Sequence, residues 1–402
     1  MVNSIHGRKR YVTFLYVTNL LQIYRMKKGP FLFGILAEGA AFTNREEETA
    51  RLVTNFSNGT NTILISPRRW GKSSLVKHAA GKLSGKRNLR FCFIDLFNIR
   101  TEEEFYETLS KEVIKSAAGK WQQWLKDAGT FFRQLSPKFS VSPDPATDLS
   151  ISLDWQEVKK NPSEILNLAE AICKSKKIRL VICMDEFQNI SYYDDPEAFQ
   201  KKLRSHWQHH QHVTYCLYGS RRHMLMDFFT RPSMPFYKFG DLLFLDKISE
   251  RYWLPFIQQR FKSTGKNIAP AVAAEIAERM KNHPYFVQQL SQQSWLLTTK
   301  DCTIEIVNEA IETLLQQHHF LFQREVDQLT VLQINFMRAM LDGVTKFTSS
   351  KNLEKYRIGT SANVKRIREA LENKEIIDSL SGKPEFLDPL FELWLQEVYF
   401  VK

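Results

Sequence analysis

A chain of 402 residues is too long for one ordinary hydrophobic core, and we therefore expect two or three domains. Its hydrophobic and charged fractions, 43% and 25%, exclude a wholly disordered protein. The net charge of +12 favours anionic partners such as nucleotides or nucleic acid, although charge alone does not prove that any is bound.

Residues 1–29 are predicted to form a leader outside the folded protein. Residues 1–37 carry six basic side chains and no acidic one. The apolar run at 11–24 is shorter than the ~20 residues that a membrane span needs, so no membrane partner is expected. A membrane anchor and a translation start at Met26 are the alternative interpretations. Five scattered cysteines without a zinc spacing indicate reduced thiols in a cytoplasmic protein.

Residues 30–246 are predicted to form an α/β core. The predicted strands are 61–66, 89–97, 179–184, 213–218 and 241–245, and the predicted helices are 73–80, 101–128 and 165–175. Apolar strands that alternate with helices are typical of a parallel sheet covered on both faces. The segment 136–163 is rich in Ser, Pro and Asp and holds two short alternating runs, which indicates a hairpin insertion or a flexible loop.

The stretch 63–75 has the pattern of a phosphate loop, or Walker A motif: a strand, a tight loop, and Gly-Lys-Ser opening a helix. Gly71 would let the backbone approach the phosphates, Lys72 would neutralise the β and γ oxygens, and Ser73 would coordinate Mg²⁺. The usual first glycine is Ser66 here, which can take the turn at modest strain. The predicted nucleotide-binding residues are Ser66, Pro67, Arg68, Arg69, Trp70, Gly71, Lys72, Ser73 and Ser74.

The strand at 179–184 ends in two carboxylates, Asp185 and Glu186, as in a Walker B motif. Beside the phosphate-loop strand, it would bring Asp185 near the metal ion, usually through a water. Glu186 could then polarise a water for attack on the γ-phosphate. The alternative is a strand that ends in solvated acids, which its position after a phosphate loop disfavours.

A strand at 89–97 lies between these two strands in the chain, a spacing that resembles the additional-strand P-loop class of AAA+ and STAND ATPases. In that class a polar side chain at the tip of the following strand reaches the γ-phosphate, and Ser220 is the candidate sensor. Arg221 and Arg222 are candidates for stabilising charge. Arg231 sits where AAA+ proteins usually carry an arginine finger that acts on a neighbouring subunit. The alternative for these arginines is a solvated loop.

Together these residues resemble the prokaryotic (archaeal and bacterial) AAA-type ATPase family, related to STAND proteins, over residues 30–402. The motifs are Phe42-Thr-Asn-Arg-Glu46, Ser66-Pro-Arg-Arg-Trp-Gly-Lys-Ser73, Met184-Asp-Glu-Phe-Gln188, Asn282-His-Pro284, Thr360-Ser-Ala-Asn-Val364 and Phe386-Leu-Asp-Pro389. The resemblance implies that Asn44 and Arg45 lie near the adenine of ATP. It also implies that His283 and Pro284 pack on the base or sugar.

Helical periods dominate residues 247–325, which are predicted to form a helical lid. In residues 326–402 the predicted helices are 328–342, 350–356 and 361–373, followed by strand-like pieces at 376–380 and 385–387. Three helices and a small hairpin describe a winged helix-turn-helix domain.

The helix 361–373 occupies the recognition-helix position of this domain. Asn363, Lys365, Arg366 and Arg368 are the candidate DNA contacts. Residues 330–402 carry 11 basic and 10 acidic side chains, and this near-neutral balance favours the alternative of a protein-interaction or regulatory module.

The sequence as a whole predicts an ATP- and Mg²⁺-dependent ATPase that acts as a nucleotide-driven switch. ATP would bind between the α/β core and the lid, and its state would control binding of DNA or a protein partner. An ATP-binding regulator or scaffold with little turnover is one alternative, and an oligomeric AAA+ motor is another. The fold alone cannot choose between them.

Overall fold

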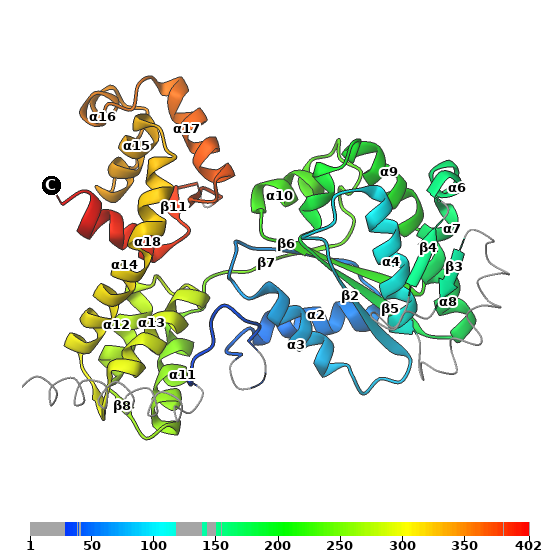
Figure 1. The fold of residues 1–402 in the computed structure, drawn as a ribbon, viewed down its shortest axis with the longest axis horizontal. Helices are drawn as coiled ribbons and strands as arrows, with labels where there is room; N and C mark the ends of the chain where they lie inside the picture. The colour runs from blue at the N-terminus through cyan, green and yellow to red at the C-terminus, as the bar shows by residue number, and fades with distance from the viewer. Residues whose placement is uncertain are drawn as a thin grey trace, which may run out of the picture.

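A computed structural model describes residues 29–37, 39, 42–117, 139–142, 150–153, 155–380 and 382–401. Figure 1 shows an α/β core on the right and, on the left, a second body that contains the remaining helices. The predicted leader, apart from Gly29, lies outside the described residues. Within the described part of the chain, no helix is both long and apolar enough to cross a bilayer.

Five strands form the sheet of the core, and all of their pairings are parallel. They are β1 (Thr62–Ile65), β2 (Leu89–Asp95), β5 (Arg179–Asp185), β6 (Val213–Gly219) and β7 (Asp241–Phe244), in the order β2-β5-β6-β1-β7. The predicted parallel α/β sheet is therefore confirmed. Every residue of β1 and β6 is buried, as expected for strands covered on both faces.

Successive residues of a strand point to opposite faces of the sheet, and both faces are apolar. Ile63 and Ile65 belong to one hydrophobic cluster and Leu64, between them, to another. The first cluster is covered by α4 (Glu102–Ala117), α8 (Leu168–Lys176), α9 (Pro196–Trp207) and α10 (Arg222–Thr230). The second is covered by α2 (Glu46–Asn58) and α3 (Lys72–Lys82). A short helix, α7 (Ser163–Leu166), precedes α8, so the helix predicted at 165–175 is two helices.

The strand order corrects one prediction. Strand β5, which carries Asp185 at its end, does not lie beside β1, because β6 separates the two. Strand β2, which lies between them in the chain, is at the edge of the sheet. Chain order does not reveal this, since long helical crossovers allow a later strand to enter between earlier ones.

Of the two interpretations of residues 136–163, the hairpin insertion is confirmed. Strands β3 (Phe139–Ser142) and β4 (Ser150–Leu153) pair antiparallel, and a helix, α6 (Trp155–Lys160), follows. The helix predicted at 101–128 is α4 as far as Ala117, and its remaining residues lie outside the described ones.

The second body joins a helical region to the winged helix. The helical region comprises α11 (Glu250–Ser263), α12 (Pro270–Arg279), α13 (Pro284–Leu297), α14 (Ile304–Asp327) and the short parallel pair β8 (Asn267–Ile268) and β9 (Asp301–Cys302). The winged helix comprises α15 (Val331–Leu341), α16 (Ser350–Tyr356), α17 (Ser361–Asn373), the hairpin β10 (Ile377–Asp378) and β11 (Glu385–Phe386), and α18 (Pro389–Trp394), which continues as a π-helical turn (Leu395–Tyr399). The predicted winged helix is therefore confirmed.

These two parts share one hydrophobic cluster, which includes residues from Ile248 to Leu395 and also Phe31. Helix α14 spans 24 residues and runs from one part into the other, so the predicted boundary at 325–326 falls inside it. Phe322 of α14 packs on Trp394 of α18, with ring centroids 5.8 Å apart. Because a shared core resists separation, the helical region and the winged helix form one unit.

Candidate nucleotide-binding site

The phosphate loop is shaped by residues with a left-handed backbone. Gly71 caps α3 with φ 86°, a conformation that glycine adopts without strain, and Arg69 has φ 62°. Ser66 is fully buried and its φ is not positive, so the strain expected from a serine at this position does not arise. The Oγ of Ser66 donates to the Pro67 carbonyl oxygen at 3.2 Å.

Lys72 follows Gly71 and begins α3, where the helix N-terminus favours an anion. Its side chain is buried, and its Nζ donates to the Pro67 carbonyl oxygen at 3.2 Å. Burial lowers the pKa of Lys72, while the charges of Glu186 and Asp185 act in the opposite direction. Pro67 is the one hydrogen-bond partner of this ammonium among the described residues, so its other donors can bind a phosphate.

Ser73 and Asp185, the predicted metal ligands, lie in direct contact. The Oγ of Ser73 donates to Oδ2 of Asp185 at 2.5 Å, and the Glu186 N–H donates to Oδ1 of Asp185 at 2.9 Å. Burial raises the pKa of Asp185, and the hydrogen bond from Ser73 and the charge of Lys72 partly offset this rise. A hydroxyl and a carboxylate that converge in this way are the oxygen donors that Mg²⁺ prefers, so the residues present fit that ion.

Glu186 and Ser220 also lie together, although they come from different strand tips. Oε2 of Glu186 accepts from the Ser220 hydroxyl at 2.9 Å and from the side-chain amide of Gln188. The Gln188 side chain packs so closely on Gly219 that a Cβ there would lie 1.8 Å from Gln188 Oε1. A larger residue than glycine at the end of β6 would therefore require the Gln188 side chain to move.

A cavity of about 750 Å³ contains this group of residues, and we call it the nucleotide cavity. Of the predicted site residues, its lining includes Arg45, Arg68, Arg69, Trp70, Gly71, Lys72, Ser73, Ser74, Glu186, Ser220 and Pro284. Those outside the lining are Asn44, Ser66, Pro67, Asp185, Arg231 and His283. Asp185 contacts the cavity through Ser73. The second body contributes Tyr285 and Gln288 of α13 as well as Pro284, so both bodies line the cavity.

The segment 32–37, which sequence reasoning did not assign to the site, also lines this cavity. The Leu32 N–H donates to Oε1 of Gln288 at 3.2 Å, and the Ala37 N–H donates to Oγ of Ser74 at 2.9 Å. The segment thus bridges α13 of the second body and α3 of the core. Three of its side chains, Phe33, Ile35 and Leu36, are at least 37% exposed, which suits contact with an apolar ligand surface. The sequence feature that could have revealed this segment is the apolar run that follows the basic leader.

Asn44 and Arg45 precede α2, and both have a left-handed backbone, with φ of 56° and 72°. Such conformations are costly for residues other than glycine and often mark functional positions. Nη1 of Arg45 pairs with Glu48 at 2.8 Å, while its Nη2 is buried with no hydrogen-bond partner in the described part of the chain. Of the two predicted residues, only Arg45 lines the nucleotide cavity.

His283 and Pro284 were predicted together, but the structure separates them. Nδ1 of His283 accepts from the Tyr285 N–H at 3.2 Å and caps α13, which turns the ring toward Trp70. Burial lowers the pKa of His283 to about 3. Pro284 lines the nucleotide cavity, whereas His283 lines a different cavity, between the core and the winged helix. The capping hydrogen bond explains why His283 does not reach the cavity.

The candidate arginines all have partners outside the nucleotide cavity. Arg221 donates to the Tyr192 hydroxyl, and Arg222 pairs with Asp378 of the winged helix. Arg231 pairs with Asp227 at 2.8 Å, and its side chain is 63% exposed. None of the three lines the nucleotide cavity.

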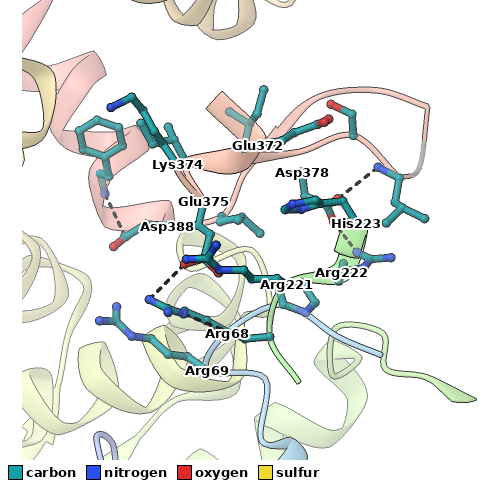
Figure 2. A pocket seen from close by; sticks show the side chains of 18 of the residues that line it. Arg68, Arg69, Arg221, Arg222, His223, Glu372, Lys374, Glu375, Asp378 and Asp388 are labelled. Atoms are coloured by element: carbon teal, nitrogen blue, oxygen red, sulfur yellow. Dashed lines mark hydrogen bonds and ion pairs between the residues drawn. The ribbon is translucent and has the colours of Figure 1, made fainter. Parts of the chain in front are cut away.

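A second cavity, of about 540 Å³, lies between the core and the winged helix, and we call it the interdomain cavity. Figure 2 shows arginines of the core facing acidic side chains that follow α17. Arg68, Arg69 and Ser220 line both cavities, so the two adjoin at these residues.

The four candidate DNA contacts on α17 do not share one exposed face. Lys365 and Arg366 are exposed, and Lys365 pairs with Glu369 at 3.8 Å. Asn363 packs against Gly359, where a Cβ would lie 2.5 Å from its Nδ2. Arg368 is half-buried, and its Nε has no hydrogen-bond partner among the described residues.

Comparison with known proteins agrees with this geometry. A family model described as "ATPase domain predominantly from Archaea" matches residues 42–286, and one described as "Probable winged helix domain" matches residues 320–397. No curated protein matches the chain.

Many solved structures match this chain, and two of them show the likeness in fold. The chain is 15% identical to the Walker-type ATPase PABY2304 of Pyrococcus abyssi, with a TM-score of 0.63 and coverage of 90% of this chain and 98% of that one. It is 14% identical to the ORC2 protein of Aeropyrum pernix, solved as ADPNP–ADP complexes, with a TM-score of 0.55 and coverage of 90% and 94%. Because the ATPase model matches more than half of the chain, the protein belongs to this predominantly archaeal family of P-loop ATPases, with a winged helix domain at its C-terminal side.

Proposed function

We propose that the protein binds ATP with Mg²⁺ in the nucleotide cavity and hydrolyses the γ-phosphate. One observation carries the proposal: Lys72, the Ser73–Asp185 pair and the Glu186–Ser220 pair converge on one cavity, although they come from three strands of the sheet. Phosphoryl transfer to water requires a cation for the phosphates, ligands for a metal ion, and a carboxylate that positions the water. These residues supply all three.

Each side chain has a separate role in this proposal. Lys72 and the N-terminus of α3 hold the phosphates, and Ser73 and Asp185 hold the metal ion. When bound, Mg²⁺ neutralises the negative charge of the phosphate oxygens. Glu186 accepts a proton from the attacking water, and Ser220 keeps its carboxylate in place through the hydrogen bond at 2.9 Å.

The base and sugar of the nucleotide occupy the part of the cavity lined by the segment 32–37, Pro284 and Tyr285. This segment offers apolar side chains that are partly exposed, and Arg45 offers a buried N–H without a partner among the described residues. Both bodies line the cavity, so the nucleotide would contact both. A ligand that contacts two bodies can change their relative position, which supports the switch.

We propose a protein rather than DNA as the partner controlled by this switch. Only Lys365 and Arg366 of the four candidate DNA contacts are exposed, and Lys365 already pairs with Glu369. DNA affinity depends on many neutralised phosphates, which two basic side chains do not supply. DNA binding that depends steeply on salt and is lost on replacement of Arg366 would contradict this choice.

The experiment that tests the function separates binding from turnover. Calorimetry with ATP and Mg²⁺ should detect binding to the wild type and to Glu186→Gln. Release of phosphate by Glu186→Gln should fall by about 10²- to 10⁴-fold, the usual contribution of a general base. Asp194→Asn, an exposed acid after the same strand, is the matched control and should keep full turnover.

Two outcomes would contradict the proposal. Absence of ATP binding to folded wild-type protein would remove its basis. Equal slow turnover by the wild type and Glu186→Gln would favour the alternative of an ATP-binding scaffold. An oligomeric motor requires an arginine that acts on a neighbouring subunit, and Arg231, paired with Asp227, is the residue whose replacement tests it.

A further inference from the structure

Among the described residues, ion pairs of one polarity join the winged helix to the rest of the protein. Four ion pairs join it to the core, to the segment after β7, and to the helical region: Arg68–Glu375 at 3.1 Å, Arg222–Asp378, Lys247–Glu385 at 3.0 Å and Lys281–Glu392 at 2.5 Å. In all four the acidic partner belongs to the winged helix. The docked position is therefore held by charge complementarity between an acidic face of the winged helix and a basic face around the nucleotide site.

Arg68 differs from the other three bases because it belongs to the phosphate loop. Its Nη1 pairs with Glu375, its Nε donates to Oγ of Ser220 at 3.4 Å, and its side chain lines both cavities. Ser220 in turn donates to Glu186. A continuous series of polar contacts thus runs from the proposed catalytic carboxylate to the winged helix. Figure 2 shows the last of these contacts, between Arg68 and Glu375.

Glu375 is held at this contact by its backbone. It follows α17 with φ 57°, a left-handed conformation that is unfavourable for a residue with a side chain. Such an outlier points to a functional constraint when the strained residue makes a specific contact. Here the side chain of Glu375 is 19% exposed and reaches across the interdomain cavity to Arg68.

We propose that Arg68 acts as a latch that tells a nucleoside triphosphate from a diphosphate. Without a γ-phosphate, Arg68 pairs with Glu375 and keeps the winged helix docked on the core. A γ-phosphate beside Lys72 and Ser220 recruits Arg68, the pair with Glu375 breaks, and the second body moves away from the core. This inference rests on the proposed function, since it requires a triphosphate in the nucleotide cavity.

The chemistry of the two partners explains why the exchange can occur. A guanidinium binds phosphate oxygens through two parallel hydrogen bonds. These bonds are stronger than those to a carboxylate, because the phosphate carries more negative charge. The Arg68 side chain is 54% exposed, so its pair with Glu375 is weakly stabilising and can be exchanged. A diphosphate ends before the position that Ser220 and Arg68 face, so it leaves the pair intact.

The movement involves the second body as a unit. The helical region and the winged helix share one core, and Lys281–Glu392 lies within that unit. The pairs that must separate are those of Arg68, Arg222 and Lys247. When the γ-phosphate takes Arg68 from Glu375, the pairs of Arg222 and Lys247 remain. Both are partly exposed, so they alone hold the winged helix less firmly.

Energy transfer between two dyes on the full chain tests the latch. The five native cysteines are buried, so Ser205→Cys on α9 and Lys351→Cys on α16 provide exposed labelling sites on the core and on the winged helix. The labelled protein is measured with no nucleotide, with ADP and Mg²⁺, and with the non-hydrolysable analogue ADPNP and Mg²⁺. Calorimetry on the same protein records whether each nucleotide binds.

We expect ADPNP to lower the energy transfer of the wild type, and ADP to leave it at the nucleotide-free value. Glu375→Gln should start below the wild-type value and respond to neither nucleotide, because Arg68 then has no carboxylate partner to exchange for the γ-phosphate. Glu385→Gln, which removes a pair away from the phosphate loop, is the matched control and should still respond to ADPNP. ADPNP should bind Glu375→Gln about three- to tenfold more tightly than the wild type, because the competing closed state is gone.

Three results would overturn the latch. ADPNP could bind the wild type and give the same transfer as ADP, in which case the inference fails and the proposed function stands. Glu375→Gln could respond to ADPNP like the wild type, which would show that another contact holds the winged helix. If calorimetry detects binding of neither nucleotide, the proposed function itself fails and the latch fails with it.

Discussion

The two cavities that meet at Arg68 are built in different ways. The nucleotide cavity combines charges of both signs from loops that follow neighbouring strands, and its buried groups hydrogen-bond one another, as Ser73 does with Asp185. The ion pairs of the interdomain cavity join bases of the core to acids of the winged helix, and these pairs are partly exposed. Buried groups tolerate little change, whereas exposed pairs can separate at small cost.

This difference assigns different tasks to the two cavities. A rigid, mutually bonded set of groups suits the binding and hydrolysis of one ligand, because the geometry is held before the ligand arrives. Weak, exposed ion pairs, in which the winged helix always supplies the acid, suit a contact that opens and closes. The following variants test whether the two cavities differ in this way, from the largest expected effect to the smallest.

Lys72→Ala should impair ATP binding in the nucleotide cavity without affecting the interdomain cavity. The loss of a buried cation that faces the phosphates is expected to weaken ATP binding on the order of 100-fold, which calorimetry would measure. Lys77→Ala, an exposed lysine on the same helix, is the control and should bind as the wild type does. Docking of the winged helix without nucleotide should be unchanged in both variants. A loss smaller than a few-fold would contradict the role of Lys72.

His283, which lines the interdomain cavity and packs on Trp70, should make stability depend on pH. Burial lowers its pKa from 6.5 to about 3, so the unfolded chain takes up a proton before the folded protein does. The contribution of the neutral ring is present above pH 6.5 and is lost as the pH falls toward 3. Each pH unit in this window removes up to about 1.4 kcal/mol of unfolding free energy.

Urea unfolding at several pH values measures this effect. His283→Asn keeps a side-chain oxygen that can cap α13 but does not titrate, and its stability should fall less than that of the wild type as the pH is lowered. Parallel pH profiles for the two proteins would contradict the assignment.

Phe33→Ala tests whether the segment 32–37 belongs to the nucleotide cavity. The ring is partly exposed and packs on Tyr285, with centroids 5.8 Å apart. Loss of one aromatic contact is worth about 1 kcal/mol, so ATP affinity should fall about fivefold. Phe320→Ala is the control, because Phe320 is more exposed and lines neither cavity. Unchanged affinity in Phe33→Ala would remove this segment from the site.

Lys247→Gln should have the smallest effect and tests the weakness of the interdomain pairs. The side chains of Lys247 and Glu385 are 37% and 54% exposed, and we expect a loss of at most about 0.5 kcal/mol in the free energy of unfolding. The difference from the wild type should vanish at high salt, as denaturant unfolding at two ionic strengths would measure. A loss several times larger would mean that this pair is a fixed part of the structure.

Much of the nucleotide site could be predicted from local patterns. The phosphate loop, the carboxylates after 179–184 and the serine after 213–218 each follow a strand, and parallel strands bring their C-terminal ends to one edge of the sheet. The placement of β6 between β1 and β5 was not predictable in this way, because chain order does not specify order in a sheet. That His283 lies outside the lining of the nucleotide cavity was not predictable either, since its capping bond to Tyr285 depends on the three-dimensional course of α13.

The residue patterns by themselves determined the α/β core, the phosphate loop and the winged helix, because each depends on interactions between residues close in sequence and on the alternation of apolar side chains. The tertiary structure alone decided that the segment 32–37 lines the cavity, that the helical region and winged helix share a core, and that Arg68 faces Glu375. These contacts join residues that are far apart in the sequence, and their partners are chosen by shape and charge in the folded protein, which no local pattern encodes.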